Sequence, residues 1–151
     1  MRRTLALTLV ALSLLLPTVG PLTGCQGGGF GAFDPRAAAM AALSEAMKQN
    51  VKSYLAGMEG LVRELSSVKD LSSAMASVEK VKPYYDDVQR VAPELKKITG
   101  KDLENLRIAF GPEIEKVAAD FNVQAERITG SGSIGTILRS VIDRVHPFSI
   151  K

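Results

Sequence analysis

The stretch that decides the fold is residues 71–95, LSSAMASVEKVKPYYDDVQRVAPEL. Its apolar residues recur every seven positions in two series, which are Leu71, Val78, Tyr85 and Ala92, and Ala74, Val81, Val88 and Leu95. Residues at this spacing share one face of an α-helix, whereas a half-buried strand needs apolar residues at every second position. Because the rest of the chain has helical spacing and no strand-like alternation of useful length, the sequence predicts an all-α protein.

The segments on either side of this stretch carry stripes of the same kind. Asp34 is a typical N-cap before Pro35, and it predicts a first long helix that ends at a turn over residues 66–69. Asp70 is expected to cap the second helix, which stops at Thr99-Gly100, and Asp102 is expected to cap the third. A glycine-serine loop over residues 130–133 then separates the third helix from a short final one, which ends before Pro147.

Proline and glycine residues interrupt these helices. Pro83 and Pro93 fall outside the heptad positions of the second helix, on its outer face, and an interior proline costs about 3 kcal/mol and bends a helix. Gly111-Pro112 interrupts the third helix and leaves open its division into two shorter ones. Gly57 and Gly60 weaken the first helix locally.

Three long helices of similar length with short turns predict an antiparallel bundle over residues 35–151. The second and third helices are kinked in this prediction, and the short C-terminal helix caps or closes the groove between them. A coiled coil between chains is the competing fold. The charged residues beside the apolar stripes form no consistent flanking pattern, which favours packing within one chain.

The N-terminus combines a charged start, Met1-Arg2-Arg3, with an apolar run from Leu5 to Leu16. This combination is typical of a secretory signal. At 1.5 Å per residue the run covers about 18 Å, which is short of the roughly 30 Å of a bilayer core. Pro17 also stops a helix early, so a permanent membrane span is not expected.

Leu22-Thr23-Gly24-Cys25 contains the only cysteine of the chain. These residues resemble the lipobox of bacterial lipoproteins. The resemblance implies that residues 1–24 are a lipoprotein signal peptide and that Cys25 becomes a lipidated first residue. The alternative is an ordinary cleaved signal with a chance cysteine after it. Two or three acyl chains on one residue make membrane attachment close to permanent.

Residues 25–34 are then a lipidated cysteine and a glycine-rich tether, which separates the membrane from the helical body. A flexible tether of this kind spans roughly 16 Å. Gln26 follows the cysteine, and a residue other than Asp at this position resembles the pattern of lipoproteins that are sorted to the outer membrane. The expected location is therefore the bacterial cell envelope, in the outer membrane facing the periplasm rather than in the inner membrane.

The charge balance argues against nucleic acid as a partner. The whole chain has a formal net charge of +3, and loss of Arg2 and Arg3 with the signal would lower it further. Nucleic-acid binding needs a strongly basic surface. A small basic patch, Lys96-Lys97 with Lys101, is compatible with anionic lipid headgroups or with the ordinary charge of a helix C-terminus.

The residues that carry most enzyme chemistry are scarce. The single histidine, His146, excludes di-iron carboxylate bundles and histidine-based zinc sites, and it lies beside Pro147 near the chain end. A haem ligated by His146 and either Met40 or Met47 is a remote possibility. Tyr84-Tyr85-Asp86-Asp87 is read as a solvated helix face, because adjacent carboxylates on a helix diverge and do not form a calcium site. The sequence predicts no catalytic residue, metal or cofactor.

Two functions follow from these observations. The first is a non-catalytic helical scaffold or adaptor that is held at the membrane by its lipid and binds another envelope protein. The second is a carrier for a lipid or a hydrophobic small molecule, in a groove held open by the kinked helices. The sequence identifies neither the partner nor the ligand.

Overall fold

The structure, a computed structural model, describes residues 33–150, so the predictions for the signal, lipobox and most of the tether lie outside it. The described residues form five helices and no strand, which confirms the all-α prediction for this part of the chain. The helices are α1 (Pro35–Ala42), α2 (Glu45–Ser67), α3 (Leu71–Lys96), α4 (Gly100–Thr129) and α5 (Ser133–Ile142).

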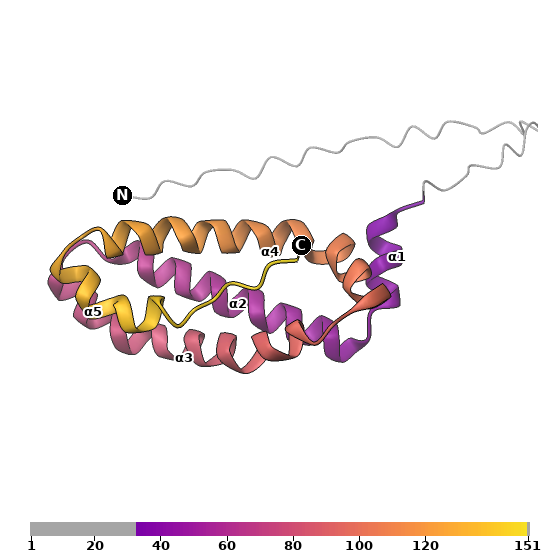
Figure 1. Cartoon of the computed structure of the whole chain (residues 1–151), viewed down its shortest axis with the longest axis horizontal. Coiled ribbons are helices and arrows are strands. Elements are labelled where there is room, and N and C mark those ends of the chain that lie inside the picture. Colours follow the sequence, from indigo (N-terminus) through magenta and orange to yellow (C-terminus); the bar gives the residue numbers. More distant parts are fainter. Residues whose placement is uncertain (1–32, 151) are drawn as a thin grey trace, which may run out of the picture. The chain divides into compact units, whose positions relative to one another are not determined.

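The three longest helices, α2, α3 and α4, lie side by side (Figure 1). α2 packs extensively against α3 and also against α4, whereas α3 and α4 make almost no direct contact. α5 packs against both α3 and α4, and α1 packs against α4. After α5 the chain continues as a non-helical segment over residues 144–150, which we call the C-terminal strap (Figure 1).

Two glycines of α2 allow α3 to approach closely. A Cβ atom at Gly57 would lie 2.9 Å from Val88 Cγ2 and 3.1 Å from the backbone oxygen of Tyr84, and one at Gly60 would overlap the Tyr84 ring. Both glycines are buried. They lower helix propensity, as the sequence indicates, but they also shape the contact surface between the two helices.

The prediction of one continuous first helix is wrong. α1 ends at Ala42, and Leu43 and Ser44 have extended backbones with ψ of 141° and 152°. The Ser44 side chain accepts a hydrogen bond of 3.2 Å from the Met47 N–H and so caps α2. The break also allows Leu43 to be buried in the core. Cap chemistry and burial together outweigh the helix propensity of the alanine-rich run.

Two of the three predicted aspartate caps are confirmed. Asp34 accepts a hydrogen bond from the Arg36 N–H at 2.9 Å, and Asp70 forms a reciprocal capping box with Ser73. The cap at Asp102 is wrong, because α4 begins at Gly100 and Asp102 lies within its first turn. Gly100 has φ of 61°, a conformation that glycine adopts more readily than other residues.

The prolines lie inside helices and do not end them. α3 continues through Pro83 and Pro93, which are both exposed, and α4 continues through Pro112. The possibility of two short helices at Gly111-Pro112 is therefore wrong. Figure 1 shows the first turns of α4 at an angle to the rest of that helix.

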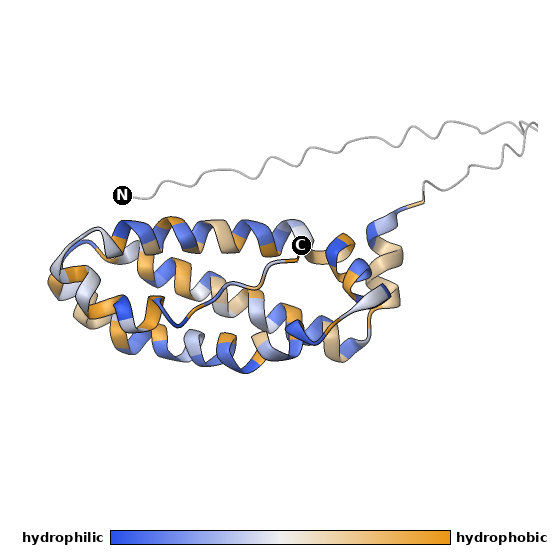
Figure 2. Ribbon diagram, viewed as in Figure 1, coloured by the Kyte–Doolittle hydropathy of each residue, from blue (hydrophilic) through white to orange (hydrophobic). Residues whose placement is uncertain are grey.

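Only part of the predicted heptad pattern is buried in the core. The series that begins at Ala74 is completely or almost completely buried, but Leu71, which begins the other series, is 48% exposed. Ser77 and Val91 are buried in addition. The buried face of α3 is thus rotated relative to the prediction. The long helices carry apolar and polar residues in alternation along their length (Figure 2), and among the described residues none is long and apolar enough to cross a membrane.

Candidate functional site

The lipidation motif predicted from the sequence, Leu22, Thr23, Gly24 and Cys25, lies outside the described residues and stays a prediction. The most elaborate arrangement within residues 33–150 is the groove that holds the C-terminal strap. It contains a fully buried tyrosine and a contact between residues far apart in the sequence. It also joins the chain end to the centre of α2.

Three apolar side chains of the strap enter the core. The exposed fraction is 7% or less for Val145, Phe148 and Ile150, whereas His146 and Ser149 face solvent. The strap crosses α2 in the space between α3 and α4 (Figure 1). It therefore fills, together with α5, the gap that the two outer helices leave over α2.

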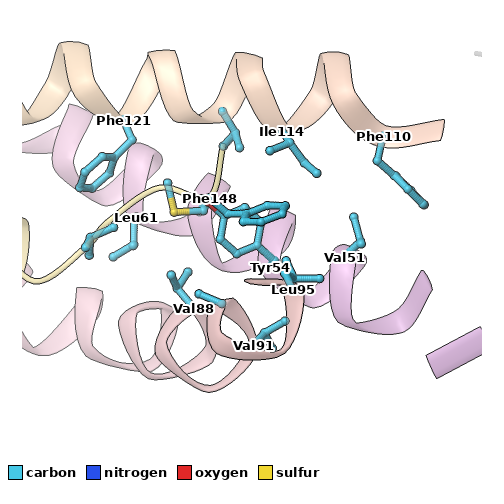
Figure 3. Close-up of a cluster of buried hydrophobic side chains, with 14 of the residues drawn as sticks. Val51, Tyr54, Leu61, Val88, Val91, Leu95, Phe110, Ile114, Phe121 and Phe148 are labelled. Atoms are coloured by element: carbon cyan, nitrogen blue, oxygen red, sulfur yellow. The ribbon is translucent and has the colours of Figure 1, made fainter. Parts of the chain in front are cut away.

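Tyr54 of α2 is the anchor of this groove. Its hydroxyl accepts a hydrogen bond of 2.7 Å from the Phe148 N–H, and the two rings meet edge to face with centroids 6.3 Å apart. Figure 3 shows both rings surrounded by apolar side chains of α2, α3 and α4. Burial raises the pKa of Tyr54, and the hydrogen bond from Phe148 partly opposes that effect. This bond satisfies a backbone donor that would otherwise be buried without a partner.

Few other polar contacts hold the strap. The side-chain amide of Gln89 donates to the backbone oxygen of Arg144 at 2.9 Å, and within the described residues this is the only other hydrogen bond from the helices α1–α4 to the strap. Open space lies along both edges. Pro147 and Phe148 line a cavity of about 350 Å³ together with Ala118 and its neighbours on α4, and a second cavity of about 70 Å³ lies on the α3 side.

The structure does not bring the sequence-based alternatives together into one site. Asp87 forms an ion pair with Arg90 at 3.0 Å on the exposed face of α3. His146 is exposed beside the end of α3, in a cavity that Met47 does not line. Among residues 33–150, no three histidine, cysteine, aspartate or glutamate side chains are close enough to hold a metal ion.

The groove between α2 and α4 has charges of both signs. It has a volume of about 350 Å³ and is lined by Glu59, Arg63, Glu113, Lys116 and Asp120, among others. Lys116 donates to Asp120 at 2.8 Å, and this contact raises the pKa of the lysine. Glu113 also pairs with Arg36, which ties α1 to α4. Because acids and bases neutralise each other here, the groove selects no charge class of ligand.

The small basic patch of Lys96, Lys97 and Lys101 lies around the turn between α3 and α4. Lys97 lines a cavity with Met47 near the start of α2, and α1 immediately precedes that helix. Lys97 pairs with Glu94 at 2.7 Å. The structure thus places the small basic patch near the beginning of α2.

Apolar residues of α3 remain uncovered. Leu71 is 48% exposed and Met75 is 63% exposed, and they lie one helical turn apart. Val78 and Tyr85 continue this line and form a cavity of about 210 Å³ with Val141 of α5. We call Leu71, Met75 and Val78 the α3 stripe. The heptad assigned Leu71 and Val78 to the core, but they lie at its margin.

Comparison with known protein families, curated proteins and solved structures finds no match to this chain. The final helix was predicted to end before Pro147 with Val145 on its apolar stripe, but α5 ends at Ile142 and Val145 belongs to the strap, so that boundary is wrong and the strap was not predicted. Phe148 and Ile150, two large apolar residues beyond Pro147, were a usable signal.

Proposed function

We propose that this protein is a lipid-anchored lipoprotein of the bacterial envelope, with a non-catalytic helical body that acts as a scaffold or adaptor. The anchor is Cys25, and residues 25–34 link it to α1. In this proposal the body is an antiparallel bundle of α2, α3 and α4, closed by α5 and the strap. The outer membrane, facing the periplasm, is the proposed location.

The position of the basic patch supports the orientation of the body. α1 begins at Pro35, directly after the tether, and the lysines at the end of α3 lie near the start of α2. A short tether keeps that end close to the lipid. Lysines near an anionic surface contribute about 1 kcal/mol each to membrane attraction.

The α3 stripe is the observation that carries the adaptor role. Leu71 and Met75 expose apolar surface beside the partly buried Val78. Exposed apolar residues that adjoin one another are typical of surfaces that bind other proteins. The stripe begins right after the α2–α3 turn, whereas the basic patch lies at the far end of α3. A partner bound there would therefore meet the body away from the membrane.

Metabolic labelling with a fatty acid tests the anchor. The wild-type protein is expected to take up label and the Cys25→Ser variant to lose it. Equal labelling of both proteins would remove the anchor from the proposal.

Photo-crosslinking in intact cells tests the adaptor role. A photoreactive residue at Met75 is expected to capture another envelope protein. The same residue at Val123, which is 60% exposed on α4, provides the matched control. Identical capture patterns at the two positions would contradict a role for the α3 stripe.

The carrier function remains the second proposal. In the structure the strap occupies the space between α3 and α4, so a ligand in that space would require the strap to move or would use the cavity beside Phe148. A native mass spectrum of the purified protein distinguishes the two functions, because a carrier retains a bound lipid or small molecule and an adaptor does not.

A further inference from the structure

Arg127, in the last turn of α4, donates hydrogen bonds to the backbone at the end of α2. Its Nη2 donates to the backbone oxygen of Leu65 at 2.6 Å, and its Nη1 donates to that of Val68 at 2.9 Å. Val68 is the C-cap of α2. The last carbonyl groups of a helix have no partner within it, and the planar guanidinium can bind two acceptors at once. Arg127 therefore caps a helix to which it does not belong.

Neighbouring residues hold the Arg127 side chain in position. Its Nε donates to Gln124 Oε1 at 2.9 Å. The next residue, Ile128, is fully buried. A Cβ atom on Gly135 would lie 2.8 Å from the Ile128 backbone oxygen, so α5 packs closely against the end of α4. The guanidinium thus extends from a backbone that the core and α5 keep in place.

These hydrogen bonds have no equivalent elsewhere between the two helices. Within residues 33–150, the bonds from Arg127 are the only ones that join α4 to α2 or to the turn between α2 and α3. Burial of apolar side chains also holds α2 against α4, but that attraction is not directional. Hydrogen bonds depend on distance and angle. Arg127 therefore fixes the position of the α2–α3 turn relative to α4.

The turn that Arg127 holds leads directly into the α3 stripe. Val68 is 1% exposed, and α3 begins at Leu71, three residues later. Asp70 and Ser73 bond reciprocally in the capping box of α3, which joins the turn to the first residues of that helix. The position of the Val68 backbone therefore determines where Leu71 is presented.

We propose that Arg127 is a positioning residue for the α3 stripe, which fixes the start of α3 so that Leu71 and Met75 are held in place for a partner. The inference rests on the adaptor function proposed above. It gives α4 a part in binding, although the stripe itself lies on α3. The role requires a guanidinium, because an ammonium group is a point charge that does not bind two carbonyl groups in this fixed geometry.

Hydrogen exchange of the purified full chain, followed by mass spectrometry, tests the clamp without a partner. Arg127→Met and Arg127→Lys are each expected to raise the exchange rate over residues 66–76 about tenfold, because hydrogen bonds from a charged group are lost. Exchange over residues 84–95 of the same helix should stay unchanged. Arg107→Lys, at an exposed position of α4, is the matched control and should leave both segments unchanged.

Three outcomes of the exchange measurement would overturn the proposal. The first is equal exchange in wild type and Arg127→Met. The second is wild-type exchange in Arg127→Lys, because a positive charge near the C-terminal end of α2 would then be sufficient without the guanidinium. The third is a rise of the same size over residues 84–95, which would show a general loss of stability instead of a local clamp.

Photo-crosslinking in intact cells connects the clamp to partner binding. A photoreactive residue at Met75 is placed in the wild-type, Arg127→Met and Arg107→Lys chains, and capture is compared at equal amounts of protein. Arg127→Met should lower capture about threefold or more, because only molecules with the stripe in place bind. Unchanged capture would contradict the positioning role. Absence of capture in all three chains would contradict the adaptor function, whereas the exchange measurement would still decide whether Arg127 holds the turn.

Discussion

α2 is covered on two sides by contacts of different kinds. On one side α3 packs along most of its length through a regular series of residues, including Ala74, Val81 and Val88. On another side the strap is fixed mainly by Phe148 on Tyr54. The comparison shows that one core can combine a periodic helix contact with a short aperiodic one, and the two should respond differently to substitution.

Of the two contacts of α2, the strap should show the larger effect. Phe148→Ala should lower the free energy of unfolding by about 3 kcal/mol, because it removes a buried ring and its edge-to-face contact with Tyr54. Urea denaturation followed by circular dichroism measures this loss. Ser149→Ala, at the neighbouring exposed position, should change stability by less than about 0.5 kcal/mol. Equal effects of the two substitutions would show that the strap is not docked in solution.

Gly57 tests the contact between α2 and α3, and Gly111 of α4 provides the control. Gly57→Ala should destabilise the protein by about 2 kcal/mol, since the new Cβ would press against Val88 Cγ2 and the backbone of Tyr84. In α4, Gly111→Ala meets only Arg107 Cγ, at 3.7 Å, and should stabilise by up to about 1 kcal/mol through helix propensity. Thermal unfolding of both variants shows whether each substitution raises or lowers the stability of the protein. A stabilising Gly57→Ala would indicate a looser contact than the structure shows.

These two contacts also mark what the sequence could predict. Periodicity reports which residues share a helix face, so the helical class, the end of α4 at the glycine-serine loop and the buried series from Ala74 were accessible. It does not report which neighbour covers that face. Leu71 and Ala92 belong to the same series of residues spaced seven apart. Leu71 is nevertheless exposed and Ala92 is buried, because the packing partners differ along α3.

The strap and the break at Ser44 required information of another kind. A segment of about seven residues has no detectable period, and its burial depends on a tyrosine far away in the sequence. The Ser44 cap competes with an alanine-rich helix, and tertiary burial of Leu43 favours the break. The groove that holds the strap could therefore not be predicted from local sequence pattern. The membrane anchor, in contrast, is proposed from a local sequence motif alone.

Removal of one hydroxyl from the strap contact should have an intermediate effect. Tyr54→Phe is expected to cost about 1–2 kcal/mol, because the buried Phe148 N–H loses its acceptor. Urea denaturation at neutral pH measures this cost. A loss smaller than that of Ser149→Ala would mean that water or another group replaces the hydroxyl.

The same pair of proteins has a predicted pH dependence. Burial raises the pKa of Tyr54 above its ordinary value of 10.0, so the folded state holds the phenolic proton more tightly than the unfolded state. The resulting stability is present below the unfolded pKa and is lost as pH rises through the folded one. The advantage of wild type over Tyr54→Phe should therefore shrink at alkaline pH. A constant difference would contradict the burial of this hydroxyl.

The smallest effect is expected on the α3 stripe. Met75→Lys should change the free energy of unfolding by less than about 0.5 kcal/mol, because Met75 is 63% exposed. Val81→Lys, on the buried face of the same helix, should destabilise strongly, since it places an unpaired charge in the core. Urea denaturation of both variants separates the two faces of α3. A large loss with Met75→Lys would mean that the stripe is covered in solution, and dependence of that loss on protein concentration would identify the cover as a second copy.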